Sequence, residues 1–183
     1  MKDNWIVNLF YKVAIGPKKY RTILTPIGPL FFLGIIGLFL YASNKTDKII
    51  GYPKLFEEPL NIIISFPIII LGIILIGWCV AHFIKAKGTP VPFSPPRSVV
   101  FKGPYAWSRN PMLTGLFILL LGIGLWLMSL SLILFYLPLF ILLNYIELKK
   151  VEEPELEKRL GKEYIKYKKR TPMFIPWKRK SPN

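Results

Sequence analysis

The sequence is short of the residues that build metal centres, disulfides and acidic surfaces. It holds one cysteine and one histidine, and only 10 acidic residues stand against 25 basic ones. The single cysteine, Cys79, excludes an intramolecular disulfide and a zinc or iron–sulfur site built from cysteines. Charged residues make up 19% of the chain, whereas an ordinary soluble domain carries about 25%. The apolar residues that take their place occur in long runs, which points to a membrane protein.

Three apolar stretches predict membrane-spanning helices. The first is centred on residues 27–42, the second covers 59–84 and the third covers 111–146. The third holds 36 residues without a charge, and one helix of that length would be roughly 54 Å long against a hydrocarbon core of about 30 Å. It therefore predicts two spans, with the break at residues 128–131. We expect an all-α integral membrane protein with about four transmembrane helices.

A short amphipathic helix is expected before the spans, lying on the membrane surface. Its apolar residues recur near helical spacing with lysines around them: Trp5, Ile6, Leu9, Phe10, Val13, Lys2 and Lys12. The apolar core is too short for a secretory signal peptide, and no small-residue cleavage site follows it.

The distribution of basic residues predicts the orientation. Lys and Arg outnumber acids five to one in residues 1–22, five to none in 85–110 and twelve to five in 149–183, whereas 44–59 holds three of each. Basic segments remain on the cytoplasmic side of a membrane, so both termini and the 85–110 loop are expected there. Anionic lipid headgroups explain the net charge of +15, and no nucleic-acid partner is expected.

Two cytoplasmic segments hold the chemically distinctive residues. Prolines recur through residues 90–111 and forbid a regular helix there. Aromatic residues such as Phe93 and Tyr105 favour an ordered loop packed against the membrane face over a disordered linker. After the last span, helical periodicity predicts a helix over 153–168 with Pro154 in its first turn.

Three motifs follow one another in these segments. The first reads Gly-Pro-Tyr-Ala-Trp-Ser-Arg-Asn-Pro-Met-Leu-Thr-Gly over residues 103–115. Beyond the hairpin come the pair Glu152 and Glu153 and then Leu-Gly-Lys-Glu-Tyr-Ile-Lys-Tyr over 160–167. The set and its order resemble the signatures of isoprenylcysteine carboxyl methyltransferases and of phospholipid N-methyltransferases.

The resemblance implies an integral membrane enzyme that uses S-adenosylmethionine. Residues 1–84 would supply the surface helix and two spans, and residues 85–183 would form the methyltransferase-like region. The methyl acceptor would be a lipid-like or prenylated molecule that enters from the bilayer. Methylation like that of isoprenylcysteine carboxylates is the first expectation and phospholipid N-methylation is the alternative. No metal is expected.

Roles for individual residues also come from the resemblance. Glu152 would hold the cofactor ammonium or a ribose hydroxyl, and Arg109 would pair with the cofactor carboxylate. The ring of Tyr105 would face the sulfonium cation. The implied cofactor-binding residues are Arg97, Ser98, Val99, Val100, Tyr105, Asn110, Pro111, Met112, Leu113 and Glu152. The implied catalytic residues are Arg109, Asn110 and Glu153, and the implied substrate contacts are Lys149 and Trp78.

Three positions depart from the family pattern. Asn110 stands where the family has histidine, and Leu113 where it has tyrosine. Leu148 stands where the carboxyl methyltransferases have an arginine for their substrate, so Lys149 or Lys150 would have to replace it. Asparagine still donates and accepts hydrogen bonds, and cofactor binding is therefore still expected.

The acceptor decides whether the reaction needs a base. A carboxylate is already anionic, whereas a phospholipid amine must lose a proton, for which Glu152 or Glu153 is the candidate base. His82, which ends the second span, is interpreted as an interfacial anchor.

Other classes of protein fit less well. A dinucleotide-binding enzyme would need a strand and a third glycine around Gly122 and Gly124. An NADPH-dependent membrane reductase and a non-enzymatic membrane protein remain as further alternatives, whereas a transporter would carry charges at mid-membrane. Glycines in the spans are predicted to allow close helix packing: Gly34, Gly37, Gly72, Gly77, Gly115, Gly122 and Gly124.

Overall fold

The computed structural model describes residues 5–17, 19, 23, 26–52, 56–86, 88–89 and 98–175, and this described part contains no β-strand. Its helices are α1 (Trp5–Ile15), α3 (Ile27–Ile50), α4 (Leu60–Lys85), α5 (Pro111–Trp126), α6 (Leu137–Glu147), α7 (Glu153–Leu160) and α8 (Lys162–Arg170). A 3₁₀ turn lies at Gly103–Ala106, and π-helical turns lie at Leu132–Tyr136 and Leu148–Glu152. The proline-rich residues 90–97 lie outside the described part.

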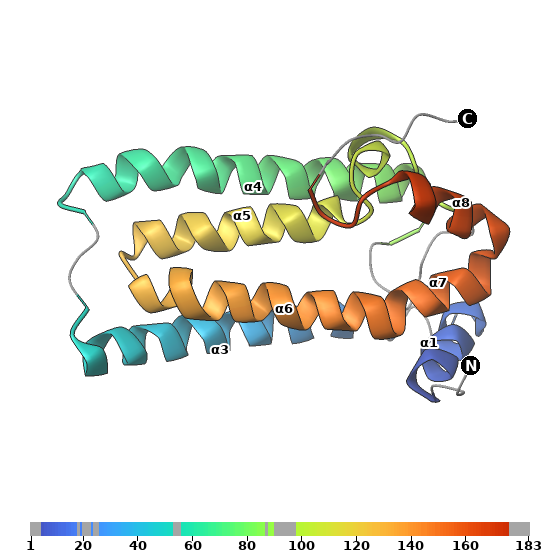
Figure 1. Ribbon diagram of the computed structural model, residues 1–183, viewed down its shortest axis with the longest axis horizontal. Coiled ribbons are helices and arrows are strands. Elements are labelled where there is room, and N and C mark those ends of the chain that lie inside the picture. The colour runs from blue at the N-terminus through green and yellow to red at the C-terminus, as the bar shows by residue number, and fades with distance from the viewer. Residues whose placement is uncertain are drawn as a thin grey trace.

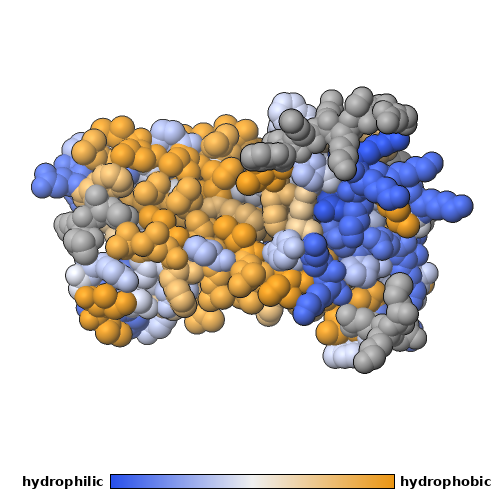
Figure 2. Space-filling model, viewed as in Figure 1, coloured by the Kyte–Doolittle hydropathy of each residue, from blue (hydrophilic) through white to orange (hydrophobic). Residues whose placement is uncertain are grey.

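The helices α3, α4, α5 and α6 run along the long axis, with α5 between α4 and α6 (Figure 1). Within the described residues, three helical stretches are long and apolar enough to cross a membrane, namely α3, α4 and the continuous helix Leu132–Leu160. The shorter α5 has 16 residues, or about 24 Å. Figure 2 shows an apolar surface along the bundle and a hydrophilic surface where α7 and α8 lie. The protein is therefore an all-α membrane protein, while the count of four spans stays a prediction.

The third apolar stretch breaks where its length requires a break. α5 ends at Trp126, and Met128 has a left-handed backbone with φ 53°. The Ser129 N–H donates to the Gly124 carbonyl at 2.9 Å, and helix resumes at residue 130. The predicted break at 128–131 is confirmed.

Asp47 of α3 caps the helix that begins after this break. The Ser131 N–H donates to Asp47 Oδ1 at 2.9 Å, and the Ser129 hydroxyl donates to Asp47 Oδ2. The Leu132 N–H donates to the Ser129 hydroxyl oxygen at 3.2 Å. Because the first N–H groups of a helix have no partner within it, these acceptors stabilise its start and tie α3 to the hairpin.

Glycines bring α4 and α5 into close contact. A Cβ on Gly72 would lie 2.8 Å from the Gly115 carbonyl oxygen, and one on Gly122 would lie 2.9 Å from the Ile69 nitrogen. Backbones approach this closely only where side chains are absent. Gly115, the last residue of the first motif, therefore serves helix packing.

The same prediction is wrong for three other glycines. A Cβ on Gly34, Gly37 or Gly77 would meet no atom within 4 Å in the described part of the chain. The sequence shows where glycines occur in the spans. It does not show which of them face a neighbouring helix.

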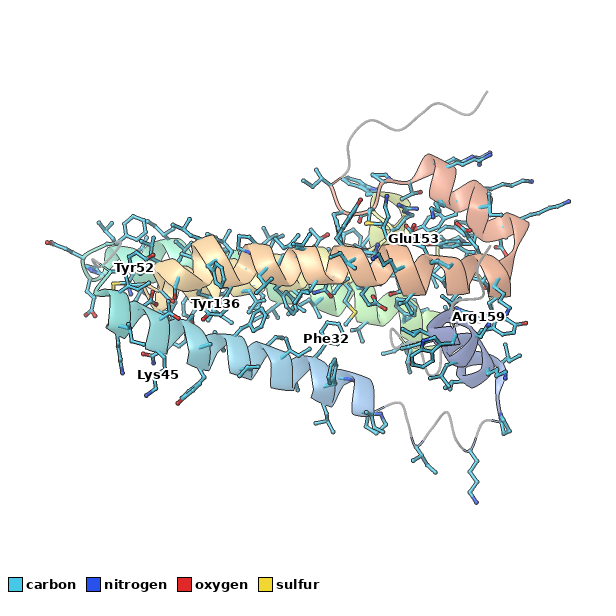
Figure 3. The ribbon with its side chains drawn as sticks, turned by 60° about the horizontal axis from the view of Figure 1, so that its bottom comes forward. Phe32, Lys45, Tyr52, Tyr136, Glu153 and Arg159 are labelled. Atoms are coloured by element: carbon cyan, nitrogen blue, oxygen red, sulfur yellow. The ribbon has the colours of Figure 1, made fainter. Side chains whose placement is uncertain are left out.

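An aromatic core joins α3, α5 and α6. The Phe140 side chain is almost fully buried, and its ring centroid lies 6.4 Å from Phe32, 5.9 Å from Phe39 and 6.0 Å from Phe117. Such edge-to-face pairs add stability beyond the burial of their area. Figure 3 shows Phe32 between α3 and the rest of the bundle.

The tail differs from the single helix predicted over 153–168. The last span continues without interruption through 148–152 into α7, and the chain then turns at Gly161, whose φ is +58°. Glycine adopts this backbone without a steric penalty, so α8 begins anew at Lys162. The prediction of one helix is wrong. The residues on both sides of Gly161 have a helical pattern, and this pattern does not reveal the turn between them.

The predicted N-terminal helix is confirmed as α1, which packs against α7. Val7 and Ala14 are buried, whereas Trp5 is 71% exposed. The Lys158 ammonium donates to Asn8 Oδ1 at 2.6 Å. α1, α7 and α8 thus gather at one end of the bundle (Figure 1), and the position of α1 on a membrane surface stays a prediction.

Candidate active site

The segment before α5 starts with a turn that packs on His82. Gly103 has φ +61°, and a Cβ at this position would overlap the His82 ring. His82 Nδ1 lies 2.9 Å from the Trp78 carbonyl oxygen. The glycine therefore permits contact with a side chain of α4, and this contact fixes the segment to the second span.

Tyr105 is buried behind this turn. Its ring meets the Phe83 ring edge-to-face at 5.2 Å, and its hydroxyl lies against the Cys79 thiol. Burial raises the pKa of Tyr105, and the neighbouring Cys79 adds to this rise, so the hydroxyl stays protonated. These contacts anchor the segment to α4. Contact of Tyr105 with a cofactor stays a prediction.

The stretch after α8, residues 171–174, returns to this segment and is called the tail strap below. The Arg109 N–H donates to the Pro172 carbonyl at 2.9 Å, and the Asn110 N–H donates to the Met173 carbonyl at 3.1 Å. Because these bonds use the main chain, they hold the tail strap against the N-terminus of α5 whatever the side chains are.

Side chains strengthen the same junction. The Ser108 hydroxyl donates to the Met173 carbonyl at 2.9 Å, and the Asn110 side-chain amide donates to it at 3.4 Å. The Phe174 ring contacts the Phe117 ring at 5.5 Å between centroids. Asn110, which stands at the family's histidine position, therefore helps to fasten the tail strap.

Tyr167 of α8 holds the segment from another direction. Its hydroxyl donates to the Tyr105 carbonyl at 2.7 Å, with a longer contact of 3.3 Å to the Ser108 carbonyl. Burial raises the pKa of Tyr167 and keeps this hydroxyl protonated as a donor. Tyr167 of the third motif thus forms hydrogen bonds to the main chain of the first motif.

An ion-pair network joins the first motif, the glutamate pair and Lys168 of α8. Glu153 is 2% exposed, and its Oε1 lies 2.9 Å from Arg109 Nη2 while its Oε2 lies 2.5 Å from Lys168 Nζ. Lys168 also donates to Glu157 Oε1 at 2.9 Å. Burial alone would lower the pKa of Lys168, but its bonds to the two carboxylates outweigh burial and raise that pKa. Lys168 therefore stays charged at neutral pH.

Arg109 retains hydrogen-bonding capacity beyond this network. Its side chain is 10% exposed, and its buried Nε and Nη1 atoms have no hydrogen-bond partner within the described residues. An unsatisfied buried donor is unfavourable, and a guanidinium matches a carboxylate in shape and charge. Arg109 is therefore a position at which an anionic group would be stabilised.

Glu152 is the acidic residue that the resemblance assigns to the cofactor, as it assigns Arg109. Burial and the nearby carboxylates of Glu147, Glu155 and Glu153 disfavour its negative charge, whereas the nearby Arg159 favours it. Its negative charge contributes to the raised pKa of the Tyr105 and Tyr164 hydroxyls. Figure 3 shows the neighbouring Glu153 toward α8.

The comparison with protein families decides the assignment. The model of the phospholipid methyltransferase family matches residues 60–163, which cover more than half of the chain and include the first motif, the hairpin and the glutamate pair. The chain belongs to the phospholipid methyltransferase family. No curated protein and no solved structure matches it. The family supports a membrane methyltransferase, and the match begins with α4, whereas the division at residues 84 and 85 stays a prediction.

In this family member the predicted catalytic residues come together at one junction, because Arg109 pairs with Glu153 and Asn110 borders the tail strap. Among the predicted cofactor residues, Pro111 is buried at the start of α5, and Met112 and Leu113 are half-buried beside it. Their roles stay predictions.

For the other predicted residues the structure gives the burial, or does not describe them. Val99 is buried, Ser98 is exposed and Val100 is half-buried, while Arg97 lies among the residues that the structure does not describe. Both predicted substrate contacts face outward. Trp78 is 49% exposed, and Lys149 is exposed with its ammonium 5.3 Å from the Tyr145 ring centroid.

Sequence reasoning missed Lys168 and the carbonyls of the tail strap. Twelve basic residues occur in 149–183, and nothing in their pattern marks Lys168. Main-chain carbonyls leave no signal in the sequence at all.

Proposed function

We propose that this methyltransferase transfers a methyl group from S-adenosylmethionine to the head of a membrane lipid at the cytoplasmic face. The observation that carries the proposal is the buried Arg109, which keeps two unsatisfied donors at the junction of the three motifs. A carboxylate-bearing ligand would satisfy them. The basic segments around this end of the bundle support its cytoplasmic position.

The residues present fit the cofactor. Arg109 would take the carboxylate of the amino-acid part, and Glu152 would take the ammonium or a ribose hydroxyl by a charge-assisted bond. When bound, S-adenosylmethionine supplies an electrophilic methyl group on a sulfonium. The protein's task is then to orient the acceptor and exclude water, and the tail strap and α8 are placed to cover the site.

The roles within the glutamate pair differ in this proposal. Each oxygen of Glu153 lies beside a cation, Oε1 beside Arg109 and Oε2 beside Lys168, so Glu153 is assigned to holding Arg109 by charge. Glu152 is assigned to the cofactor and, for an amine acceptor, to accepting the proton. Asn110 is assigned to fastening the tail strap.

An amine-bearing phospholipid is the acceptor that we favour. The carboxyl methyltransferases have an arginine where this chain has Leu148, and Leu148 is 1% exposed. Lys149 points away over the Tyr145 ring and does not replace the missing arginine. Methylation of an isoprenylcysteine carboxylate is therefore the second choice.

The test is calorimetric titration of the purified protein with S-adenosylhomocysteine. We expect Glu152→Gln to weaken binding by about 10- to 100-fold, because hydrogen bonds to charged groups contribute about 1.5–3 kcal/mol. Glu57→Gln is the matched control, since Glu57 is exposed before α4 and belongs to none of the three motifs. Absence of binding to folded wild type, or equal affinities for the two variants, would refute the proposal.

The acceptor is tested separately in lipid nanodiscs with isotopically labelled S-adenosylmethionine. We expect labelled N-methylated products in nanodiscs that contain phosphatidylethanolamine, and no label in nanodiscs of phosphatidylcholine alone, because its nitrogen is already fully methylated. Transfer only to a prenylcysteine would favour the second choice.

A further inference from the structure

Arg109 and Lys168 make their closest contacts with different oxygens of Glu153. Arg109 Nη2 lies 2.9 Å from Oε1, and Lys168 Nζ lies 2.5 Å from Oε2. The buried carboxylate is therefore shared between two cations that come from different parts of the chain. Arg109 approaches it from the segment before α5, and Lys168 approaches it from α8.

We propose that Lys168 is a positioning residue, which holds Oε2 of Glu153 so that Nε and Nη1 of Arg109 remain available for the carboxylate of the cofactor. The inference deepens the proposed function and rests on it. Lys168 itself does not touch the cofactor; it acts through Glu153 and Arg109.

The geometry of guanidinium–carboxylate pairs gives the reason. A guanidinium and a carboxylate prefer a bidentate arrangement with two parallel hydrogen bonds. If Lys168 were absent, both oxygens of Glu153 would be available to Arg109, and a second guanidinium nitrogen would turn toward Glu153. Arg109 would then have fewer donors for a ligand. With Lys168 present, one oxygen is taken, and the two remaining nitrogens stay without a partner in the described part of the chain.

The turn at Gly161 places Lys168 for this role. It folds α8 back along α7, so that Lys168 also reaches Glu157 at 2.9 Å. Glu157 is 38% exposed, whereas Glu153 is 2% exposed. A surface ion pair contributes little to stability, so the contact with Glu157 orients the lysine while the buried contact with Glu153 carries the effect.

A purely structural role for Lys168 predicts a different result from a positioning role. If Lys168 only holds α8 in place, its loss weakens every ligand of the site alike. If it acts through Arg109, its loss weakens only ligands that carry the amino-acid carboxylate. S-adenosylhomocysteine carries this group, and 5′-methylthioadenosine has the same nucleoside without it.

The experiment titrates the full-length protein with these two ligands. We expect Lys168→Met and Lys168→Gln to bind S-adenosylhomocysteine about tenfold more weakly and to bind methylthioadenosine as wild type does. Lys168→Arg keeps the charge and is expected to retain the affinity for S-adenosylhomocysteine. Lys169→Met is the matched control, because Lys169 is the exposed neighbour, and it should leave both affinities unchanged.

The outcomes separate this inference from the proposed function. Equal weakening of both ligands, or unchanged affinity in Lys168→Met and Lys168→Gln, overturns the positioning role while the proposed function stands. Lack of S-adenosylhomocysteine binding by folded wild type overturns the proposed function, and the inference falls with it. If Lys168→Met does not fold, the contrast between Lys168→Gln and Lys168→Arg decides in the same way.

Discussion

Replacement of Gly72 by alanine tests the contact that sets α5, and with it Arg109, against α4. The added Cβ would lie 2.8 Å from the Gly115 carbonyl oxygen and 2.8 Å from the Leu119 nitrogen. Real Cβ atoms do not come so close, and both neighbours are backbone atoms. No side chain can rotate to make room, so α4 and α5 must move apart.

The expected loss of stability follows from this geometry. Overpacking a well-packed interface destabilises a protein by about 1–3 kcal/mol. Alanine is favoured over glycine in a helix by about 1 kcal/mol, which offsets part of the loss. Because a whole helix must shift, the upper part of the range is the better guide. A net loss of about 1–2 kcal/mol, with about 2–4 °C per kcal/mol for a chain of this size, should lower the unfolding temperature by about 2–8 °C.

Cys79 provides the assay. It is the single cysteine and is fully buried on α4, so a thiol-reactive fluorophore reports unfolding as its thiol becomes accessible. Gly77→Ala is the matched control on the same helix, since its Cβ would meet no described atom within 4 Å. It should leave the unfolding temperature unchanged or raise it slightly. If Gly72→Ala behaves like Gly77→Ala, the close packing of α4 on α5 is not what stabilises the bundle.

Two further predictions concern opposite ends of the bundle. Tyr167→Phe removes the donor to the Tyr105 carbonyl and should destabilise the protein by about 0.5–1.5 kcal/mol while also weakening S-adenosylhomocysteine in calorimetry; unchanged ligand affinity would contradict this. Asp47→Ala leaves the Ser131 N–H without its acceptor and should lower stability by about 1–3 kcal/mol in the thiol assay. Its ligand affinity should equal that of wild type, and a loss as large as that of Tyr167→Phe would refute our view that Asp47 only caps the hairpin.

The features that sequence reasoning predicted are those that the bilayer imposes. Apolar length against hydrocarbon thickness is a strong constraint, and it gave both the long helices and the break at residues 128–131. The features that it missed depend on a partner. Asp47 caps a helix that is remote in sequence, and Gly72 faces a backbone whereas Gly77 does not.

The site was predicted on different grounds. Arg109, Glu153 and Tyr167 came from a resemblance of motifs, and the physical chemistry of single residues would not have selected them. Lys168 belongs to no such motif and is one of many basic residues in the tail. Its importance depends on the turn at Gly161, and the helical pattern on both sides of that glycine concealed the turn.

One sequence feature nevertheless predicts that the motifs meet. Arg109 and Glu153 are 44 positions apart, and in an unbroken helix they would lie about 66 Å from each other. In the folded chain their charged atoms are 2.9 Å apart, because the break at Met128 returns the chain to the end of the bundle from which it came. A charge-free stretch too long for one span therefore does more than raise the count of helices. It requires that the residues on its two flanks share one membrane face, and this is the condition for a site that neither flank could form alone.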